Sequence, residues 1–145
     1  MYSERLGLEV GGQEDSTHGF FEDPYDDFGR LSFEMWRALR LVVDTGIHAF
    51  DWDRQKSINY MLANSALSRK NVGNEVDRYI SWPGQAVAYK IGEIQIRKLR
   101  EMAENELKEE FDIREFHDAL LAEGPLPLPI LTMKIEEWVT TKKEE

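Results

Sequence analysis

A Pro-Gly pair interrupts residues 78–92, which read RYISWPGQAVAYKIG. Because the residue before a proline disfavours helical dihedral angles, this pair predicts the end of one helix and the start of the next. The first turns of the second helix mix polar side chains with small and apolar ones. A run of similar character, RLVVDTGIH, lies upstream at residues 40–48. Polar groups are costly to bury and are often kept for chemistry, so these two runs are the places to look for a site.

Apolar residues recur at helical spacing along nearly the whole chain, and no segment alternates as a strand does. The sequence therefore predicts an all-α fold of about seven helices in an irregular, bundle-like array. Four helix starts carry N-cap signals, at Asp23 before Pro24, at Asp53, at Ser68 and at Asp112. The expected helices span residues 2–10, 24–48, 53–64, 68–81, 84–109, 112–124 and 129–139.

We expect residues 1–139 to form a single helical domain, followed by a frayed, charged tail at residues 140–145. No residue before Tyr2 can cap the first helix, which resembles the middle of an element more than its beginning. We therefore expect this first helix to be truncated at its start, as it would be in a fragment of a longer protein.

The composition indicates a globular protein, because 41% of the residues are hydrophobic. A net charge of −10 argues against partners that attract basic patches, namely nucleic acids and anionic membranes. The chain has no cysteine, which excludes disulfides and thiolate metal sites. We find no signal peptide and no membrane-spanning segment, so the chain is expected to be soluble, and cytoplasmic if it is complete.

Asp44 and His48 lie four residues apart, on one face of a helix that also carries Arg37 and Arg40. The carboxylate is then placed to hold the imidazole ring and to fix its tautomer. One interpretation makes His48 a proton donor, or a hydrogen-bond donor to a developing oxyanion. The other is a buried network of Arg, Asp and His that satisfies its own hydrogen bonds. The pattern alone favours the structural interpretation.

Gln85 and Tyr89 are also four residues apart, on the helix that follows the Pro-Gly pair. Tyr89 could donate a hydrogen bond to a negatively charged oxygen, and Arg78 or Lys90 could hold a carboxylate. The alternative is a tyrosine hydroxyl at the boundary of the core with a solvated Lys90. The pattern does not decide between these interpretations.

The three histidines are scattered and form no His-x-x-x-His pair. No zinc site can be assembled from known ligand spacings, so we predict no metal ligands in this chain.

Several runs resemble the domain-of-unknown-function 885 family. They are residues 30–37, 40–49, 78–92 and 111–120. The likeness extends from Tyr2 to Trp138, and it is most specific in the Asp-Thr-Gly-Ile-His run and in the Pro-Gly-Gln-Ala-x-Ala-Tyr-Lys run.

This resemblance implies the carboxy-terminal part of a helical, zinc-dependent metallopeptidase, a hydrolase of peptide bonds. Full-length members of the family are several times longer, and their zinc site is expected in a His-Glu-x-x-His helix followed by a Glu in a Glu-Gly-Trp-Ala-Leu-Tyr segment. Met1-Tyr2 stands where the end of that segment would fall, and this chain contains neither ligand motif. Zinc is thus implied for full-length members and not for this chain alone.

By analogy with helical zinc peptidases, the resemblance implies that His48 and Tyr89 stabilise the tetrahedral oxyanion, with Asp44 orienting His48. It also implies that positively charged and amide side chains position the peptide substrate. These are Arg40, Arg78, Gln85 and Lys90.

We therefore expect the chain to be inactive by itself and to bind a peptide substrate only when the missing amino-terminal part completes it. The main alternative is a helical protein-interaction or structural module that stands alone and has no catalysis. In a fragment, an exposed apolar face would favour self-association. An unrelated hydrolase that uses His48 as a base is a remote third reading, because no nucleophile is suitably placed nearby.

Overall fold

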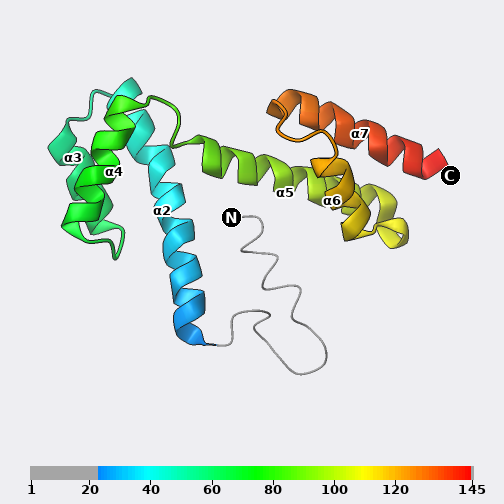
Figure 1. Cartoon of the computed structure of the whole chain (residues 1–145), viewed down its shortest axis with the longest axis horizontal. Coiled ribbons are helices and arrows are strands. Elements are labelled where there is room, and N and C mark those ends of the chain that lie inside the picture. The colour runs from blue at the N-terminus through cyan, green and yellow to red at the C-terminus, as the bar shows by residue number, and fades with distance from the viewer. Residues whose placement is uncertain (1–22, 145) are drawn as a thin grey trace. The chain divides into compact units, whose positions relative to one another are not determined.

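The computed structural model describes residues 23–144, which form helices and connecting segments (Figure 1). The helices are α2 (Pro24–Ala49), α3 (Arg54–Ala63), α4 (Arg69–Ser81), α5 (Ala88–Leu107), a 3-10 turn (Lys108–Glu110), α6 (Ile113–Leu121) and α7 (Leu128–Glu144). The described residues contain no strand, so the all-α prediction is confirmed. The helix expected at residues 2–10, and with it the expected truncation at its start, lies outside the described residues.

The N-cap residues predicted from the sequence act as caps. Asp23, Asp53 and Asp112 accept hydrogen bonds through their carboxylates from the backbone N–H groups of Tyr25, Lys56 and Arg114, at 2.8, 2.7 and 2.8 Å. The Ser68 hydroxyl accepts a longer bond of 3.3 Å from the N–H of Asn71. Each cap satisfies an N–H group that has no partner inside its helix, which fixes where these helices begin.

The largest difference from the sequence prediction is the start of α5, which was expected near Gly84. Residues 82–87 form turns instead, and the helix begins at Ala88. Gly84 has a φ of 78°, a left-handed conformation that no α-helix contains and that glycine adopts without steric cost. The Pro-Gly pair therefore belongs to a turn that precedes the helix.

Helix α7 differs from its prediction at the other end. It continues to Glu144, through residues that were expected to form a frayed tail. The hydroxyls of Thr140 and Thr141 donate to backbone carbonyls of the preceding turn, and Lys143 pairs with Glu106 at 2.6 Å. These bonds tie the charged end of the chain to the helix.

The chain divides into two compact units, residues 1–91 and residues 92–145. The prediction of one domain over residues 1–139 concerns how these units associate, and it stays a prediction. In the first unit, α3 and α4 pack against each other and against α2 (Figure 1). The core between them consists mainly of apolar side chains. Its largest buried members are Val43, Ile58, Met61, Val72, Val76 and Tyr79.

The second unit is organised by the packing of α6 against α7. Phe116 and Ile135 are completely buried in it. The Phe116 ring meets the ring of Trp138 edge-on at 6.2 Å and that of Phe111 at 6.0 Å. The contact between Phe111 and Phe116 is a hydrophobic staple at the start of α6. Among residues 23–144, no helix combines the length and the apolar character needed to cross a membrane.

Gly46 provides a test of the packing in the first unit. A Cβ atom added at this position would lie 2.6 Å from Cδ2 of the Trp52 indole. We predict that Gly46→Ala lowers the free energy of unfolding by about 1–3 kcal/mol, because the indole must move from its packed position. Urea denaturation followed by circular dichroism measures the change.

The matched control is Gly29→Ala in the same helix, where an added Cβ has no neighbour within 4 Å. This variant should be more stable than the natural protein by about 0.5–1 kcal/mol, since alanine favours the helix. An equal gain at both positions would show that Trp52 does not pack on Gly46.

Candidate functional site

The polar centre of the first unit is the carboxylate of Glu75 on α4. Its Oε2 atom accepts hydrogen bonds from Nη2 of Arg78 at 2.8 Å and from the hydroxyl of Tyr79 at 2.7 Å. Nη2 of Arg40, on α2, donates to the same oxygen at 3.3 Å. A single oxygen thus joins two helices through three donors.

The side chain of Arg40 is charged but buried, and polar and aromatic side chains surround it. The residue is 8% exposed, and its Nε atom donates to the Tyr79 hydroxyl at 3.1 Å. Its guanidinium carbon lies 5.0 Å from the ring centroid of Trp36 and 4.8 Å from that of Tyr89. Aromatic faces attract a cation, and this attraction is stronger when the cation is shielded from water. The charge is therefore stabilised by Glu75 and by aromatic rings together.

A chain of hydrogen bonds leads from this centre toward the surface. Nη1 of Arg78 donates to Oε1 of Gln85 at 2.6 Å, and Nε2 of Gln85 donates to the Tyr89 hydroxyl at 3.4 Å. Tyr89 is 43% exposed, so its hydroxyl is the outer end of the chain. We call the connected residues the Glu75 cluster. Its members are Arg40, Glu75, Arg78, Tyr79, Gln85 and Tyr89.

The electrostatics of the cluster favour an ionised Glu75. Burial raises the pKa of this carboxyl, but the hydrogen bonds from Arg78 and Tyr79 and the charges of Arg78 and Arg40 outweigh that effect and leave the pKa below its usual value. The hydrogen bond to Glu75 raises the pKa of Arg78, and burial raises the pKa of Tyr79. At neutral pH the cluster therefore holds one carboxylate between two guanidinium groups.

Asp44 does not hold His48, contrary to the sequence prediction. The carboxylate is 3% exposed and accepts the backbone N–H of Gly84, at 3.1 Å to Oδ1 and 3.2 Å to Oδ2. The two residues share a helix face, but the Asp44 side chain is directed to the turn between α4 and α5. Asp44 therefore positions the turn that carries Gln85 toward Tyr89.

His48 is exposed, and its partner is the backbone of α4. Its Nε2 atom lies 3.0 Å from the carbonyl oxygen of Tyr79. Because a carbonyl only accepts, Nε2 carries the hydrogen, and the neutral ring then presents Nδ1 as an acceptor. This carbonyl belongs to the last turn of α4, where backbone oxygens lack helical partners. The tautomer is thus fixed by Tyr79 and not by Asp44.

Lys90 pairs with α2. Its Nζ atom donates to Oε1 of Glu34 at 3.2 Å, and the side chain is only 13% exposed. Oε2 of Glu34 also accepts from Arg30, which in turn donates to Asp27 at 2.8 Å. An acidic side chain on the neighbouring helix therefore holds Lys90, which rules out the solvated Lys90 of the structural alternative. Its role in substrate binding stays a prediction.

Of the seven predicted site residues, the structure brings Arg40, Arg78, Gln85 and Tyr89 together in the Glu75 cluster. Their roles in a site stay predictions. Sequence reasoning missed Glu75, which connects them. The signal was available, because Glu75 precedes Arg78 by three residues and Tyr79 by four, which places all three on one helical face. Among residues 23–144, no group of three or more His, Asp or Glu side chains is placed to bind a metal ion.

Replacement of Glu75 tests the cluster through its pH dependence. We predict that Glu75→Gln lowers the free energy of unfolding by about 1–3 kcal/mol at pH 7, since two guanidinium groups lose a charged acceptor. The folded-state pKa of Glu75 is depressed, so its contribution is complete above the ordinary value of 4.5 and is lost as the pH falls through the folded-state pKa. The difference between the two proteins should therefore shrink below about pH 4.5 in urea titrations.

Asp77→Asn is the matched control on the same helix. Asp77 pairs with Arg54 at 2.6 Å, but both side chains are more than half exposed. Because water surrounds this pair, its loss should cost much less than the loss of the Glu75 carboxylate. If Asp77→Asn lowered the free energy of unfolding as much as Glu75→Gln, the Glu75 cluster would stabilise the fold no more than an exposed ion pair does.

Comparison with known proteins places the chain in a family. Residues 1–135 match the model of a family described as "Bacterial protein of unknown function (DUF885)". A crystal structure described as that of "the putative lipoprotein from Colwellia psychrerythraea" is 41% identical, with a TM-score of 0.88. The match covers 97% of this chain and 23% of that one, so this chain spans less than a quarter of the length of its solved relative. No curated protein matches the chain. The family match covers most of the sequence, and the chain therefore belongs to the DUF885 family of bacterial proteins.

Proposed function

We propose that this chain supplies the substrate-facing side chains of a zinc-dependent peptidase whose metal ligands belong to other parts of a full-length DUF885 protein. The Glu75 cluster carries the proposal. It holds an exposed tyrosine, an amide and two arginines in one connected network. A network of this kind keeps donors in place before a substrate arrives, which is what transition-state stabilisation requires.

Tyr89 is the residue we assign to the oxyanion of a peptide under attack. Its hydroxyl oxygen accepts a hydrogen bond from Gln85, which leaves the hydroxyl hydrogen to be donated outward. Its ring lies against the guanidinium of Arg40, which fixes the direction of the side chain. Both contacts are made within the protein, so little reorganisation is needed when negative charge develops on the substrate.

Arg78 and Gln85 are suited to position the peptide. The guanidinium of Arg78 has five N–H groups, and the bonds to Glu75 and Gln85 leave others available for a carbonyl or carboxylate oxygen. The guanidinium of Arg40 lies against the ring of Tyr89 and holds it in place. Lys90 anchors the first turn of α5 to Glu34. In this proposal Arg40 and Lys90 are positioning residues.

His48 and Asp44 have different parts in the proposal. His48 remains a candidate donor to the substrate through Nδ1, provided that the ring is doubly protonated, because Nε2 is committed to the Tyr79 carbonyl. Asp44 acts through the Gly84 turn that leads to Gln85 and Tyr89.

The described side chains do not fit a zinc ion. Guanidinium and hydroxyl donors occupy the carboxylate of Glu75, and the carboxylate of Asp44 accepts a backbone N–H. The Nε2 atom of His48 is bonded to the carbonyl of Tyr79. Zinc also prefers three or four ligands, and no such set occurs between residues 23 and 144. The proposal therefore gives this chain binding and positioning roles only.

The first test is made on the 145-residue chain itself. Metal analysis after dialysis should find far less than one equivalent of zinc, and a mixed peptide library should remain uncleaved. Tight binding of one zinc per chain, together with cleavage that a chelator abolishes, would overturn the proposed division of roles.

The second test uses a hybrid in which this chain replaces the matching segment of the full-length Colwellia relative. We predict cleavage of library peptides that chelator abolishes, and a decrease of about 10²-fold in kcat for Tyr89→Phe with little change in KM. Tyr25→Phe is the control, because Tyr25 is 82% exposed and outside the Glu75 cluster. Absence of cleavage in both the hybrid and the relative would refute the peptidase assignment, and an unchanged kcat for Tyr89→Phe would refute the role of Tyr89.

A further inference from the structure

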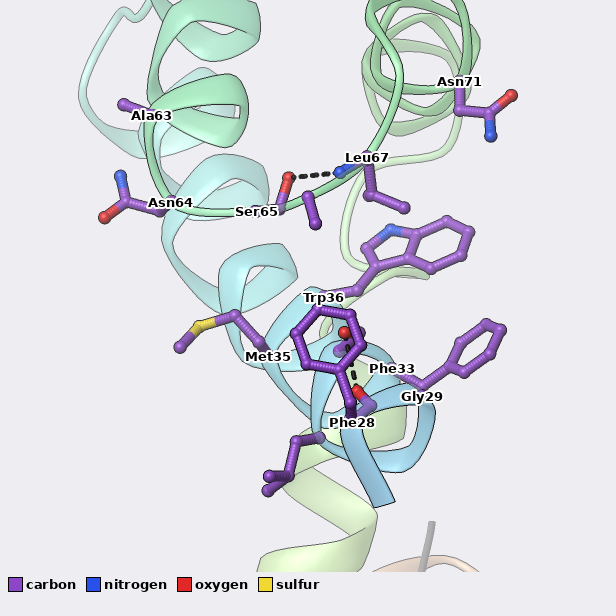
Figure 2. Close-up of a pocket in the computed structure, with 13 residues that line it drawn as sticks. Phe28, Gly29, Phe33, Met35, Trp36, Ala63, Asn64, Ser65, Leu67 and Asn71 are labelled. Atoms are coloured by element: carbon purple, nitrogen blue, oxygen red, sulfur yellow. Dashed lines mark hydrogen bonds between the residues drawn. The ribbon is translucent and has the colours of Figure 1, made fainter. Parts of the chain in front are cut away.

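A groove in the first unit is lined mainly by apolar side chains. Its volume is about 870 Å³, and its lining comes from α2 between Phe28 and Trp36, from Ala63 at the end of α3, from residues 64–67 and from Asn71 of α4. Figure 2 shows Phe28, Met35 and Trp36 of α2 on one side, and Ser65 and Leu67 on the other. Among residues 23–144, no charged side chain lines the groove, although 32% of the residues in the chain are charged. A surface without charges in such a chain indicates a contact that excludes water.

Of the four polar side chains that line the groove, all but Asn71 donate to a backbone carbonyl four residues earlier in the chain. The Ser32 hydroxyl donates to the carbonyl of Phe28 at 2.7 Å, and the Ser65 hydroxyl donates to that of Met61 at 2.7 Å. The Asn64 amide donates to the carbonyl of Tyr60 at 2.8 Å. Because these donors are already used, an occupant of the groove needs few polar groups of its own.

The apolar side chains of α2 that line the groove are also open to solvent. Leu31, Phe33 and Met35 are about half exposed, at 49%, 50% and 50%, and Phe28 is 60% exposed. We call these four side chains the outer stripe of α2. A small ligand seated in the groove would leave part of the outer stripe in water. An extended apolar surface of this kind marks a protein contact.

We propose that the groove and the outer stripe of α2 are the docking surface for an apolar polypeptide segment from the remainder of a full-length DUF885 protein. The solved relative supports this choice of occupant. It contains this fold almost entirely, at a TM-score of 0.88, yet the match takes up only 23% of its chain. The rest of such a protein must pack against some surface of this segment, and burying the apolar side chains of the groove is favourable. The inference does not depend on zinc or on peptide cleavage.

Cysteine labelling tests the docking surface, because the chain has no cysteine of its own. Ala66→Cys places a thiol in the groove, and Asn74→Cys places one on the exposed side of α4. The rate of maleimide modification of each site is measured by mass spectrometry in the 145-residue chain and in the hybrid with the Colwellia relative. We expect the Ala66→Cys thiol to react at least tenfold more slowly in the hybrid, and the Asn74→Cys thiol to react at the same rate in both proteins.

Each other outcome assigns a different occupant and overturns the proposal. Equal rates at Ala66→Cys in both proteins would leave the groove open to solvent or to a small ligand. Protection that appears in the 145-residue chain only at high concentration would assign the groove to a second copy. Protection in the dilute 145-residue chain would assign it to another segment of this same chain. Inactivity of the hybrid toward peptides would leave this labelling result unaffected.

A second variant tests the docking surface without the use of a labelled thiol. Met35→Glu places a charge on the outer stripe of α2, and it should leave the Tm of the 145-residue chain within about 2 °C because the side chain is half exposed there. In the hybrid the same substitution should lower the Tm by more than about 5 °C, since the charge would be buried at the docking surface. Asn59→Glu, at an exposed position of α3 outside the groove, should change neither Tm, and equal shifts for Met35→Glu in the two proteins would argue against docking.

Discussion

The arrangement of the first unit depends on one requirement, that the buried charge of Arg40 be compensated. A guanidinium removed from water is strongly unfavourable unless it meets a carboxylate and its donors are satisfied. Glu75 supplies the carboxylate, the Tyr79 hydroxyl accepts from Nε, and the rings of Trp36 and Tyr89 cover the planar faces. These partners come from three separate helices, so the compensation of one charge sets the positions of α2, α4 and the start of α5.

The turn between α4 and α5 is the second constraint, and Asp44 connects it to the first. Asp44 lies one helical turn after Arg40 on α2, and its carboxylate accepts the N–H of Gly84. The same helix that buries the guanidinium therefore also fixes the loop that delivers Gln85 and Tyr89. This explains how exposed residues after a Pro-Gly pair, which would otherwise be mobile, are held beside the cluster. It also gives the exposed Tyr89 a fixed position beside Arg40.

The sequence predicted the local features well and the contacts between helices poorly. The caps at Asp23, Asp53 and Asp112 depend on residues only two or three apart, so their positions could be read directly. The partners of Asp44 and His48 could not, because helical spacing places two side chains on one face but does not say whether a third segment competes for them. Gly84 and the Tyr79 carbonyl are such competitors, from 40 and 31 residues away. The sequence analysis missed the role of Glu75 for the same reason, because that role depends on a contact with Arg40 on another helix.

Tyr79 makes contacts at both of its ends, and this has a mechanical consequence. Its hydroxyl meets Arg40 and Trp36, while its carbonyl meets His48, so one residue of α4 is attached to α2 at points about two turns apart. A shift of α4 by one residue in register would require a rotation of about 100° around its axis, and it would break both attachments together. Helices α2 and α4 must therefore move as one rigid body.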